Sequence, residues 1–339
     1  MMSRRTPVLA MVWVLAVAVL GVQAADFTIG SASGDVQAGK AKDTLAAVAV
    51  GAAFKGATVL QTGPDGQVAA SIDEKNGFRL HPDTRLKADI GGKASRVTLE
   101  KGAVTSTLDA WPAGKAYEVA TPAGKVVARG TTFTVAYVLG PDGQRVATVD
   151  VAQGEVEFVT PEGSVPSLAA NAGMTLSRTV GQESTMLTVT AKDAPLTLVL
   201  GDRHRITVAA GSTVRVAVPL RYIDRFVAVA VDSGSATVGS QALSAGSQPV
   251  YVAGAAVIPN ADASALMAAV QAESSAFAQS QLPGLTDEQR TALLEAQRLG
   301  AQAIVAAVTD AGVLERKPLL PFVPGDRLFA TPLSPSGTP

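Results

Sequence analysis

The stretch VVARGTTFTV, residues 126–135, reads as a β-strand interrupted by Arg129 and Gly130. Phe133 lies after the interruption, and its position in the alternation is opposite to that of Val126 before it. Successive side chains of a strand point to opposite faces, so a slip of one residue turns every side chain over. A bulge or a tight corner would absorb the slip, and glycine tolerates either backbone. The stretch therefore predicts a β-fold that bends here.

Arg129, at this break, is the one charged residue that the sequence predicts to be buried. Its guanidinium could contact a ligand or a partner, but the favoured interpretation is structural, with Arg129 bonding freed carbonyl groups or lying on a sheet edge. Similar breaks occur at LEKGAV, residues 99–104, and at VDVAQGEVEF, residues 149–158, where the break falls on Gly154. Repeated breaks of this kind predict corners at which the sheet folds back over its own core.

Short apolar runs separated by Gly, Pro or Asp recur throughout residues 25–190, a cadence typical of a β-sandwich or roll. The sequence Gly-Pro-Asp-Gly-Gln occurs at residues 63–67 and again at 140–144, and both copies are predicted as hairpin tips. Residues 195–258 contain further strands. They could extend the first sheet system, but a separate small β-module is the favoured interpretation.

The C-terminal part has a different composition from the strand-rich part before it. Residues 261–312 predict a pair of Ala-rich helices, and Thr286 followed by Gln289 forms a capping-box signature at the start of the second. The Pro-rich segment 313–339 is predicted to be extended or disordered. The predicted fold class is thus mainly β, with a helical pair after the strands.

The N-terminus has the layout of a secretory signal peptide. Arg4 and Arg5 precede an apolar run over residues 8–22, and Ala24 ends a small-residue cleavage site. The run is short for a membrane span, which needs about 20 residues. We expect cleavage after Ala24 and a periplasmic or secreted protein with no stable membrane span, although an uncleaved anchor is the alternative.

Composition excludes several classes of protein. A net charge of −1 gives no electrostatic reason to expect nucleic acid as a partner, since nucleic-acid binding needs a basic face. The chain contains no cysteine, which removes disulfides, thiol nucleophiles and Cys-ligated zinc. A secreted chain of 339 residues without disulfides fits the bacterial envelope.

Seven short motifs occur in a consistent order between residues 25 and 178, from Gly-Asp-Val at 34–36 to Gln-Gly-Glu-Val at 153–156. The most specific is TPAGKVVARGTTFTV, residues 121–135. Together they resemble the FecR-type periplasmic domain, named after the regulator of iron-dicitrate transport. The structural motif residues that we assign are Asp65, Gly66, Pro122, Arg129, Gly130, Thr131, Phe133 and Gly154.

The resemblance implies an envelope location and a sensing or scaffolding role without catalysis. The family's best-known members are anti-sigma regulators with a cytoplasmic helical region and one transmembrane helix. This sequence departs from that plan because its signal begins at residue 1, so sigma-factor regulation is not implied. The resemblance supplies no ligand residues.

The sequence offers little for catalysis or metal binding. It has two histidines: His81 is predicted in a turn, and His204, between two arginines, is predicted as a solvated loop residue. No HExxH, P-loop or G-x-S-x-G motif is present, and no EF-hand spacing supports a calcium site around the turn aspartates. We therefore predict no catalytic residue, no cofactor and no metal.

Three functions follow from these observations. The leading hypothesis is an exported, non-enzymatic binding or scaffolding protein of the envelope, whose partner is a protein or a glycan. The second is a periplasmic sensor or anti-sigma-type signalling component that works through a separate membrane partner. A glycan-active enzyme on a β-scaffold is the third, and it would require a cleft with two close carboxylates.

Overall fold

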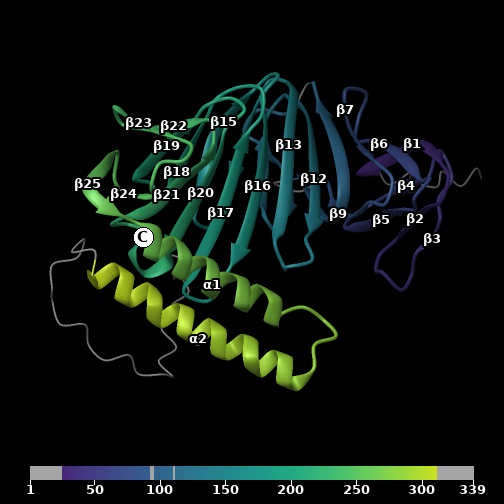
Figure 1. Ribbon diagram of the computed structural model, residues 1–339. Coiled ribbons are helices and arrows are strands. Elements are labelled where there is room, and N and C mark those ends of the chain that lie inside the picture. Colours follow the sequence, from purple (N-terminus) through teal and green to yellow (C-terminus); the bar gives the residue numbers. More distant parts are fainter. Residues whose placement is uncertain (1–24, 92–94, 110, 311–339) are drawn as a thin grey trace, which may run out of the picture.

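A computed structural model describes residues 25–91, 95–109 and 111–310. Two sheets, antiparallel except where β10 runs parallel to β9, pack face to face, and two C-terminal helices lie against the outer side of one of them (Figure 1). The prediction of a mainly β fold with a C-terminal helical pair is confirmed. The predicted signal peptide and the Pro-rich tail lie outside the described residues.

We call the sheet beneath the helices sheet A and the other sheet B. Sheet A contains β1 (Phe27–Ser33), β4 (Ala53–Phe54), β6 (Gln67–Ser71), β7 (Asn76–Leu80), β9 (Ser95–Leu108), β12 (Thr132–Leu139), β13 (Arg145–Gln153), β16 (Gly173–Val180), β17 (Ser184–Ala191), β20 (Thr213–Pro219), β21 (Val227–Ser233), β24 (Val250–Ala253) and β25 (Ala256–Asp262). Sheet B contains the first part of β9 together with β2 (Val36–Gly39), β3 (Ala46–Ala47), β5 (Thr58–Thr62), β8 (Arg85–Asp89), β10 (Tyr117–Thr121), β11 (Gly124–Ala128), β14 (Glu155–Val159), β15 (Gly163–Ala169), β18 (Leu196–Leu200), β19 (His204–Val208), β22 (Ser235–Val238) and β23 (Gln241–Ser244).

From β10 onward the chain places hairpins in the two sheets alternately: β10–β11 in sheet B, β12–β13 in sheet A, β14–β15 in sheet B, and so on to β24–β25. Each new hairpin pairs with the edge left by the previous hairpin of its own sheet, as β16 pairs with β13. The two sheets therefore lengthen together in chain order.

The interruption at Arg129 and Gly130 is one of the crossings between the sheets. β11 ends at Ala128 in sheet B, and β12 begins at Thr132 in sheet A. Gly130 has φ +71°, a conformation that costs most residues energy. The break is thus a corner, and the change of alternation lets side chains before and after it both face the core.

Gly154 sits at the next crossing, from sheet A to sheet B, with φ +79°. The two corners are stacked, because a Cβ added at Gly154 would lie 2.7 Å from the carbonyl oxygen of Gly130. The predicted break at residues 99–104 behaves differently. There β9 continues through Gly102 and passes from sheet B to sheet A within one strand.

The two Gly-Pro-Asp-Gly-Gln turns also differ. Residues 140–144 form a hairpin tip between β12 and β13, as predicted. Residues 63–67 do not, since β5 lies in sheet B and β6 in sheet A. This turn is a crossing that packs on the β1–β2 crossing, where Asp35 accepts a backbone hydrogen bond from Gly63.

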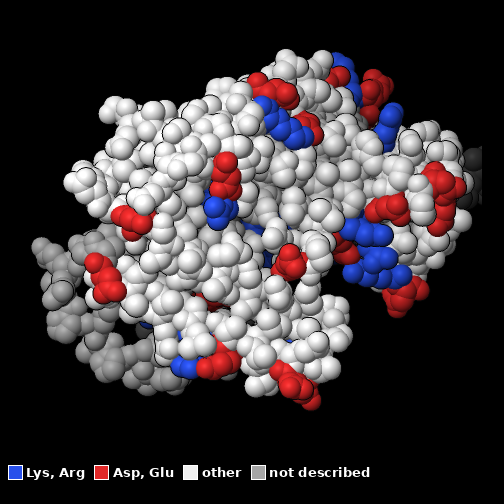
Figure 2. All heavy atoms as spheres, in the orientation of Figure 1, with Lys and Arg blue, Asp and Glu red and all other residues white. Residues whose placement is uncertain are grey.

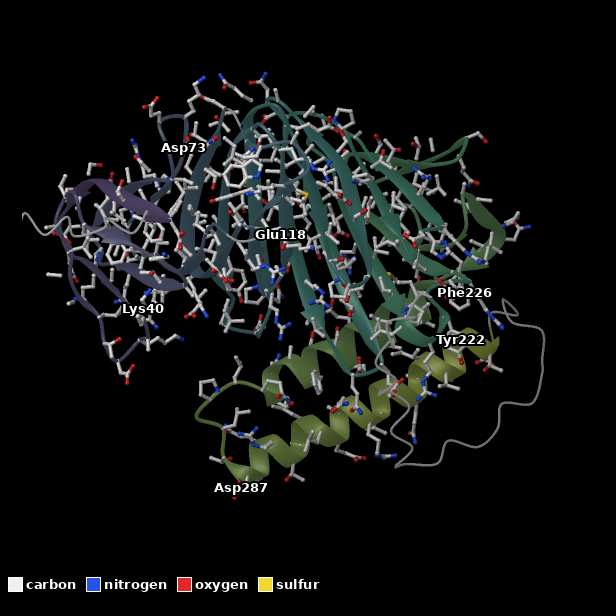
Figure 3. All side chains as sticks on the ribbon, turned by 180° about the vertical axis from the view of Figure 1, so that it is seen from behind. Lys40, Asp73, Glu118, Tyr222, Phe226 and Asp287 are labelled. Carbon is white, nitrogen blue, oxygen red and sulfur yellow. The ribbon has the colours of Figure 1, made fainter. Side chains whose placement is uncertain are left out.

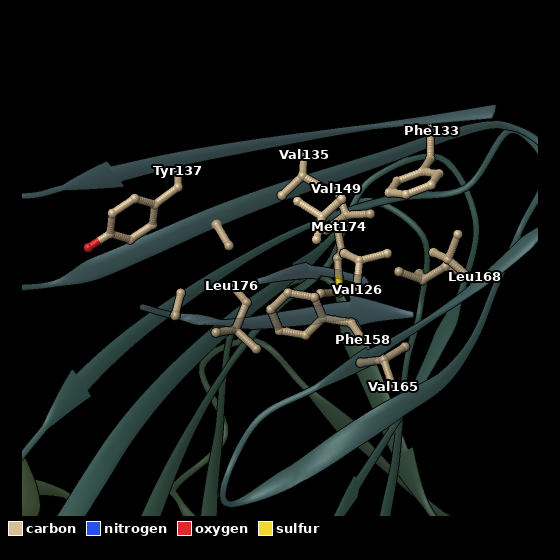
Figure 4. Close-up of a cluster of buried hydrophobic side chains, with 14 of the residues drawn as sticks. Val126, Phe133, Val135, Tyr137, Val149, Phe158, Val165, Leu168, Met174 and Leu176 are labelled. Carbon is tan, nitrogen blue, oxygen red and sulfur yellow. The ribbon is translucent and has the colours of Figure 1, made fainter. Parts of the chain in front are cut away.

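The main core fills the space between the sheets (Figure 4). Phe133 from β12 and Phe158 from β14 are almost completely buried within it, together with Leu176 from β16. One ion pair is also enclosed: Arg178 of β16 donates to Glu162 at 2.6 and 2.8 Å, and Thr185 donates to the same carboxylate. Burying charges is costly unless they are paired in this way.

The strands of residues 195–258 add to the same sheets. β18 pairs with β15, and β20 pairs with β17 along its whole length. β21 is buried on both faces, as its continuous apolar sequence indicates, because the core lies on one side and a helix on the other. A domain boundary near residues 190–195 stays a prediction.

The helices are α1 (Ser264–Ser280) and α2 (Asp287–Asp310), and a short 3₁₀ turn, η1 (Leu220–Tyr222), precedes β21. The capping box is present, with reciprocal hydrogen bonds between Thr286 and Gln289. A second, smaller core joins the helices to sheet A, where Phe226 and Tyr251 pack edge to face beside Leu266. Within the described residues, neither helix has the length and hydropathy needed to cross a membrane.

Glu273 of α1 fastens the helices to the sheet. Its buried carboxylate accepts the backbone N–H groups of Gln182 and Glu183 and the hydroxyl of Ser184, at 2.8, 3.3 and 2.6 Å. Gly300 of α2 leaves room for this arrangement, since a Cβ there would lie 2.7 Å from the backbone nitrogen of Glu273. The carboxylate thus binds the β16–β17 turn.

Candidate functional site

The helices cover only part of the outer side of sheet A. α1 contacts β16, β17, β20 and β21, whereas the strands on the other side of β16 are left uncovered (Figure 1). We define the open face as the outward-pointing residues of β6, β7, β12 and β13 and of residues 102–108 of β9, the part of that strand in sheet A. Threonine is frequent on it, and its only charged residues are Arg79 and Asp150.

Threonine pairs hold this face together. The hydroxyls of Thr105 and Thr134 are 2.8 Å apart across β9 and β12, and those of Thr148 and Thr175 are 3.2 Å apart across β13 and β16. Cross-strand pairs of this kind stabilise a sheet and restrict side-chain rotation. The open face is therefore a pre-ordered, polar but largely uncharged surface.

The outer side of sheet B is different. There Glu118 lies between Arg96 and Lys125, with N–O distances of 2.7 and 3.0 Å (Figure 3). Burial acts to raise the pKa of Glu118, but hydrogen bonds from Lys125 and Arg96 outweigh it and hold the pKa below its ordinary value. Figure 2 shows charged side chains spread over the face seen in Figure 1, among them an acidic and a basic group side by side near its middle.

A groove of about 400 Å³ lies at one end of the open face, on β6, β7 and β9. Ala69, with a small side chain, and Gly77, with none, line it, and Arg79, Thr105 and Thr107 are among its polar residues. Gly77 is paired with Thr107 and Arg79 with Thr105 in the β7–β9 ladder. This groove is a concave feature of the open face that a ligand could occupy.

The histidines have unequal positions. His81 is in the turn after β7, as predicted, and its Nε2 lies 2.8 Å from the Thr105 hydroxyl at the groove. The prediction for His204 is wrong, because its side chain is fully buried in β19. Its Nδ1 accepts the backbone N–H of Gly254, and its Nε2 contacts the carbonyl oxygen of Ile223. Burial lowers the pKa of His204.

The motif residues assigned from sequence occupy corners, turns and the core. Arg129 is exposed at its corner, so it is not the buried charge that the sequence suggested. The others lie at crossings or turns (Asp65, Gly66, Pro122, Gly130, Thr131 and Gly154) or in the core (Phe133). The structure brings none of them into the groove.

Arg79 and Thr105, which shape the groove, were not singled out from sequence. Alternating threonines at 105 and 107 and at 132 and 134 were visible, but their meeting on one surface depends on strand pairing.

Among the described residues, no group of three or more His, Asp or Glu side chains is placed to hold a metal ion.

Residues 58–157 match a family model described as FecR protein. The chain contains a FecR domain. The match lies inside the range 25–178 that the sequence motifs delimit, and the resemblance to this family is confirmed. The matched residues run from β5 into β14 and so contain every strand of the open face.

Comparison with curated proteins gives no match. Two crystal structures of a candidate anti-sigma factor from Parabacteroides distasonis are similar to part of the chain, each at 18% identity. Their TM-scores are 0.32 and 0.31, and each alignment covers 35% of this chain. The chain spans 55% and 54% of the lengths of those structures.

The C-terminal helices touch the FecR domain directly. Gly143, in the β12–β13 hairpin tip, lies close enough to α1 that an added Cβ would be 2.8 Å from the Ala278 carbonyl oxygen. The open face is therefore bordered by α1 at the end of this hairpin. A partner seated on the open face would meet both the FecR domain and the helical pair.

Proposed function

We propose that this chain is an exported, non-enzymatic protein that binds another protein through the open face of its FecR domain. The observation that carries the proposal is the contrast between the two outer surfaces. The open face is uncharged apart from Arg79 and Asp150, whereas Arg96, Glu118 and Lys125 cluster on the outer side of sheet B.

Loss of charge from the centre of a surface is a mark of protein interfaces. Ordered threonine pairs add hydrogen-bonding groups whose conformational entropy is already reduced, which lowers the cost of binding. The exposed Val138 and Leu139 near the β12–β13 tip add apolar area beside α1. These features favour a protein partner.

A glycan partner has less support. Small-molecule and sugar sites usually use aromatic and apolar linings with a few polar groups. The outward residues of the open face include no aromatic side chain, because Phe133 and Tyr137 of β12 point into the core. We therefore favour protein over glycan recognition.

The alternative is a periplasmic sensor or anti-sigma-type component acting through a separate membrane partner. The FecR domain supports a regulator-like role. In this alternative the helical pair, which contacts both the FecR domain and β16–β21, would report partner binding. The binding-protein hypothesis and the sensor hypothesis predict different partner proteins.

A photo-crosslinking amino acid placed at Thr134 tests the proposal in the native host. We expect protein adducts from Thr134 and none from a matched position at Lys87, which is exposed on sheet B. Mass spectrometry of the adducts identifies the partner. Mass spectrometry of the chain itself identifies its N-terminal residue, which we expect to be Ala25. Adducts with an inner-membrane regulator favour the sensor; glycan adducts alone, or equal labelling at both positions, reject the proposal.

A further inference from the structure

The groove on β6, β7 and β9 is built by small residues. Ala69 lies directly opposite Arg79 in the β6–β7 ladder, and Gly77 lies two residues before Arg79 on the same face of β7. Because Ala69 and Gly77 have little or no side chain, the surface is hollow beside the long Arg79 side chain. An added Cβ at Gly77 would lie 2.6 Å from the Ala70 carbonyl oxygen.

Arg79 is the one charged residue that lines the groove. Among the described residues, none makes a hydrogen bond or an ion pair with its side chain. The other charge of the open face, Asp150, is already paired with Lys192 at 2.6 Å. The guanidinium of Arg79 therefore leaves one positive charge without a counterpart on this face.

Neutral hydroxyl groups lie beside that charge. Thr105 is directly opposite Arg79, and its hydroxyl is held between His81 Nε2 and the Thr134 hydroxyl, at 2.8 Å from each. Thr107 adds a second hydroxyl next to Gly77. An acceptor bound to Arg79 would thus have further polar groups within the same groove.

We propose that this groove binds one carboxylate group through Arg79. A guanidinium matches a carboxylate in a two-point hydrogen-bonded geometry, and one cation neutralises one carboxylate. A doubly charged phosphate would leave excess negative charge, since no second cation lines the groove. The methyl group of Ala69 provides an apolar contact for the methylene groups that precede the carboxylate of Asp or Glu.

This inference deepens the proposed function and rests on it in one respect: the carboxylate is assigned to an acidic side chain of the partner protein. A free small carboxylic acid would satisfy the same chemistry. The test therefore uses both sources, and it does not require the partner to be known.

The full chain, labelled with ¹⁵N, is titrated with sodium acetate and, separately, with the peptides Ac-Ala-Glu-Ala-NH₂ and Ac-Ala-Gln-Ala-NH₂, at constant ionic strength set with NaCl. We expect saturable NMR shifts at Gly77, Arg79 and Thr107 with the Glu peptide and none with the Gln peptide. Arg79→Gln should weaken binding at least about tenfold, the loss of one charge-assisted contact. Ala69→Leu, which fills the hollow and leaves the charge, should also weaken it.

Arg96→Gln is the matched control, because it removes the same charge from sheet B, and it should bind like the unaltered chain. Tighter binding of the Glu peptide than of acetate supports an acidic side chain of a partner protein as the ligand. Tighter binding of acetate overturns the assignment to a protein and supports a free small carboxylic acid at the same site. Shifts that do not saturate, or that persist in Arg79→Gln, overturn the site itself. Crosslinking at Thr134 could still succeed then, so failure of this inference is distinguishable from failure of the proposed function.

Discussion

At the scale of single residues, the corners depend on backbone conformations that few side chains tolerate. Gly154 and Gly114 both have φ +79°, but their surroundings differ. An added Cβ at Gly154 would lie 2.7 Å from the Gly130 carbonyl oxygen, whereas nothing lies within 4 Å at Gly114. The pair therefore separates the cost of the dihedral angle from the cost of the clash.

We expect Gly114→Ala to lower the free energy of unfolding by about 1–2 kcal/mol, the cost of a left-handed alanine. Gly154→Ala should lower it by clearly more, because the stacked corners must also move apart. Urea denaturation of both variants measures the difference. Equal midpoints would show that the corners are not closely stacked.

Sequence patterns predicted these corners better than they predicted the groove. The change of alternation between Val126 and Phe133 is a local signal, since a strand cannot reverse its faces without a break. Choosing between a bulge and a corner required knowing which sheet each side joins. Arg79 and Thr105 meet only through the pairing of β7 with β9, and no local pattern encodes that pairing.

At the scale of elements, a buried carboxylate adds to the smaller apolar core in holding the helical pair on sheet A. Glu273 satisfies the N–H groups of Gln182 and Glu183 and the Ser184 hydroxyl, which would otherwise be left without these bonds. The sequence predicted both helices and the capping box at Thr286, which are local features. It gave no sign of Glu273, because its partners lie some 90 residues earlier in the chain.

Glu273→Leu keeps a similar volume but removes the acceptor, so we expect a loss of about 2–4 kcal/mol in the stability of helix docking. Hydrogen exchange should quicken at the amides of Gln182 and Glu183 and along α1. Glu273→Gln, which retains one acceptor oxygen, should restore much of the protection. As a control, Glu295→Leu alters an exposed position on α2 and should leave this exchange unchanged. If exchange is also unchanged in Glu273→Leu, the Glu273 carboxylate does not hold the helices on the sheet.

At the scale of the whole molecule, specific polar contacts join the two sheets in addition to the apolar core. The Arg178–Glu162 pair joins the sheets in the middle. Near the C-terminal end His204 of sheet B contacts the Ile223 carbonyl and accepts the N–H of Gly254, next to sheet A. This geometry requires the neutral imidazole with its proton on Nε2.

Acid should therefore weaken this end of the molecule. Burial lowers the folded-state pKa of His204, so the unfolded chain binds the proton first, and stability falls as the pH drops from about 6.5 through the folded-state pKa. Asp224 and Arg203, the charges nearest the ring, act in opposite directions on that pKa. Urea midpoints at pH 7.5, 6.5 and 5.5 should diverge between the unaltered chain and His204→Gln; parallel curves would contradict the expectation.

The alternation of hairpins between the two sheets also has a consequence for how the chain reaches this structure. From β10 onward every hairpin pairs with strands that precede it in the chain. Because synthesis starts at the N-terminus, each hairpin finds its partner strands already made, and the two sheets can form in chain order. Each stage leaves two open strand edges that the next two hairpins close. In sheet A the series ends at β25, where Pro259 is a poor template for another strand.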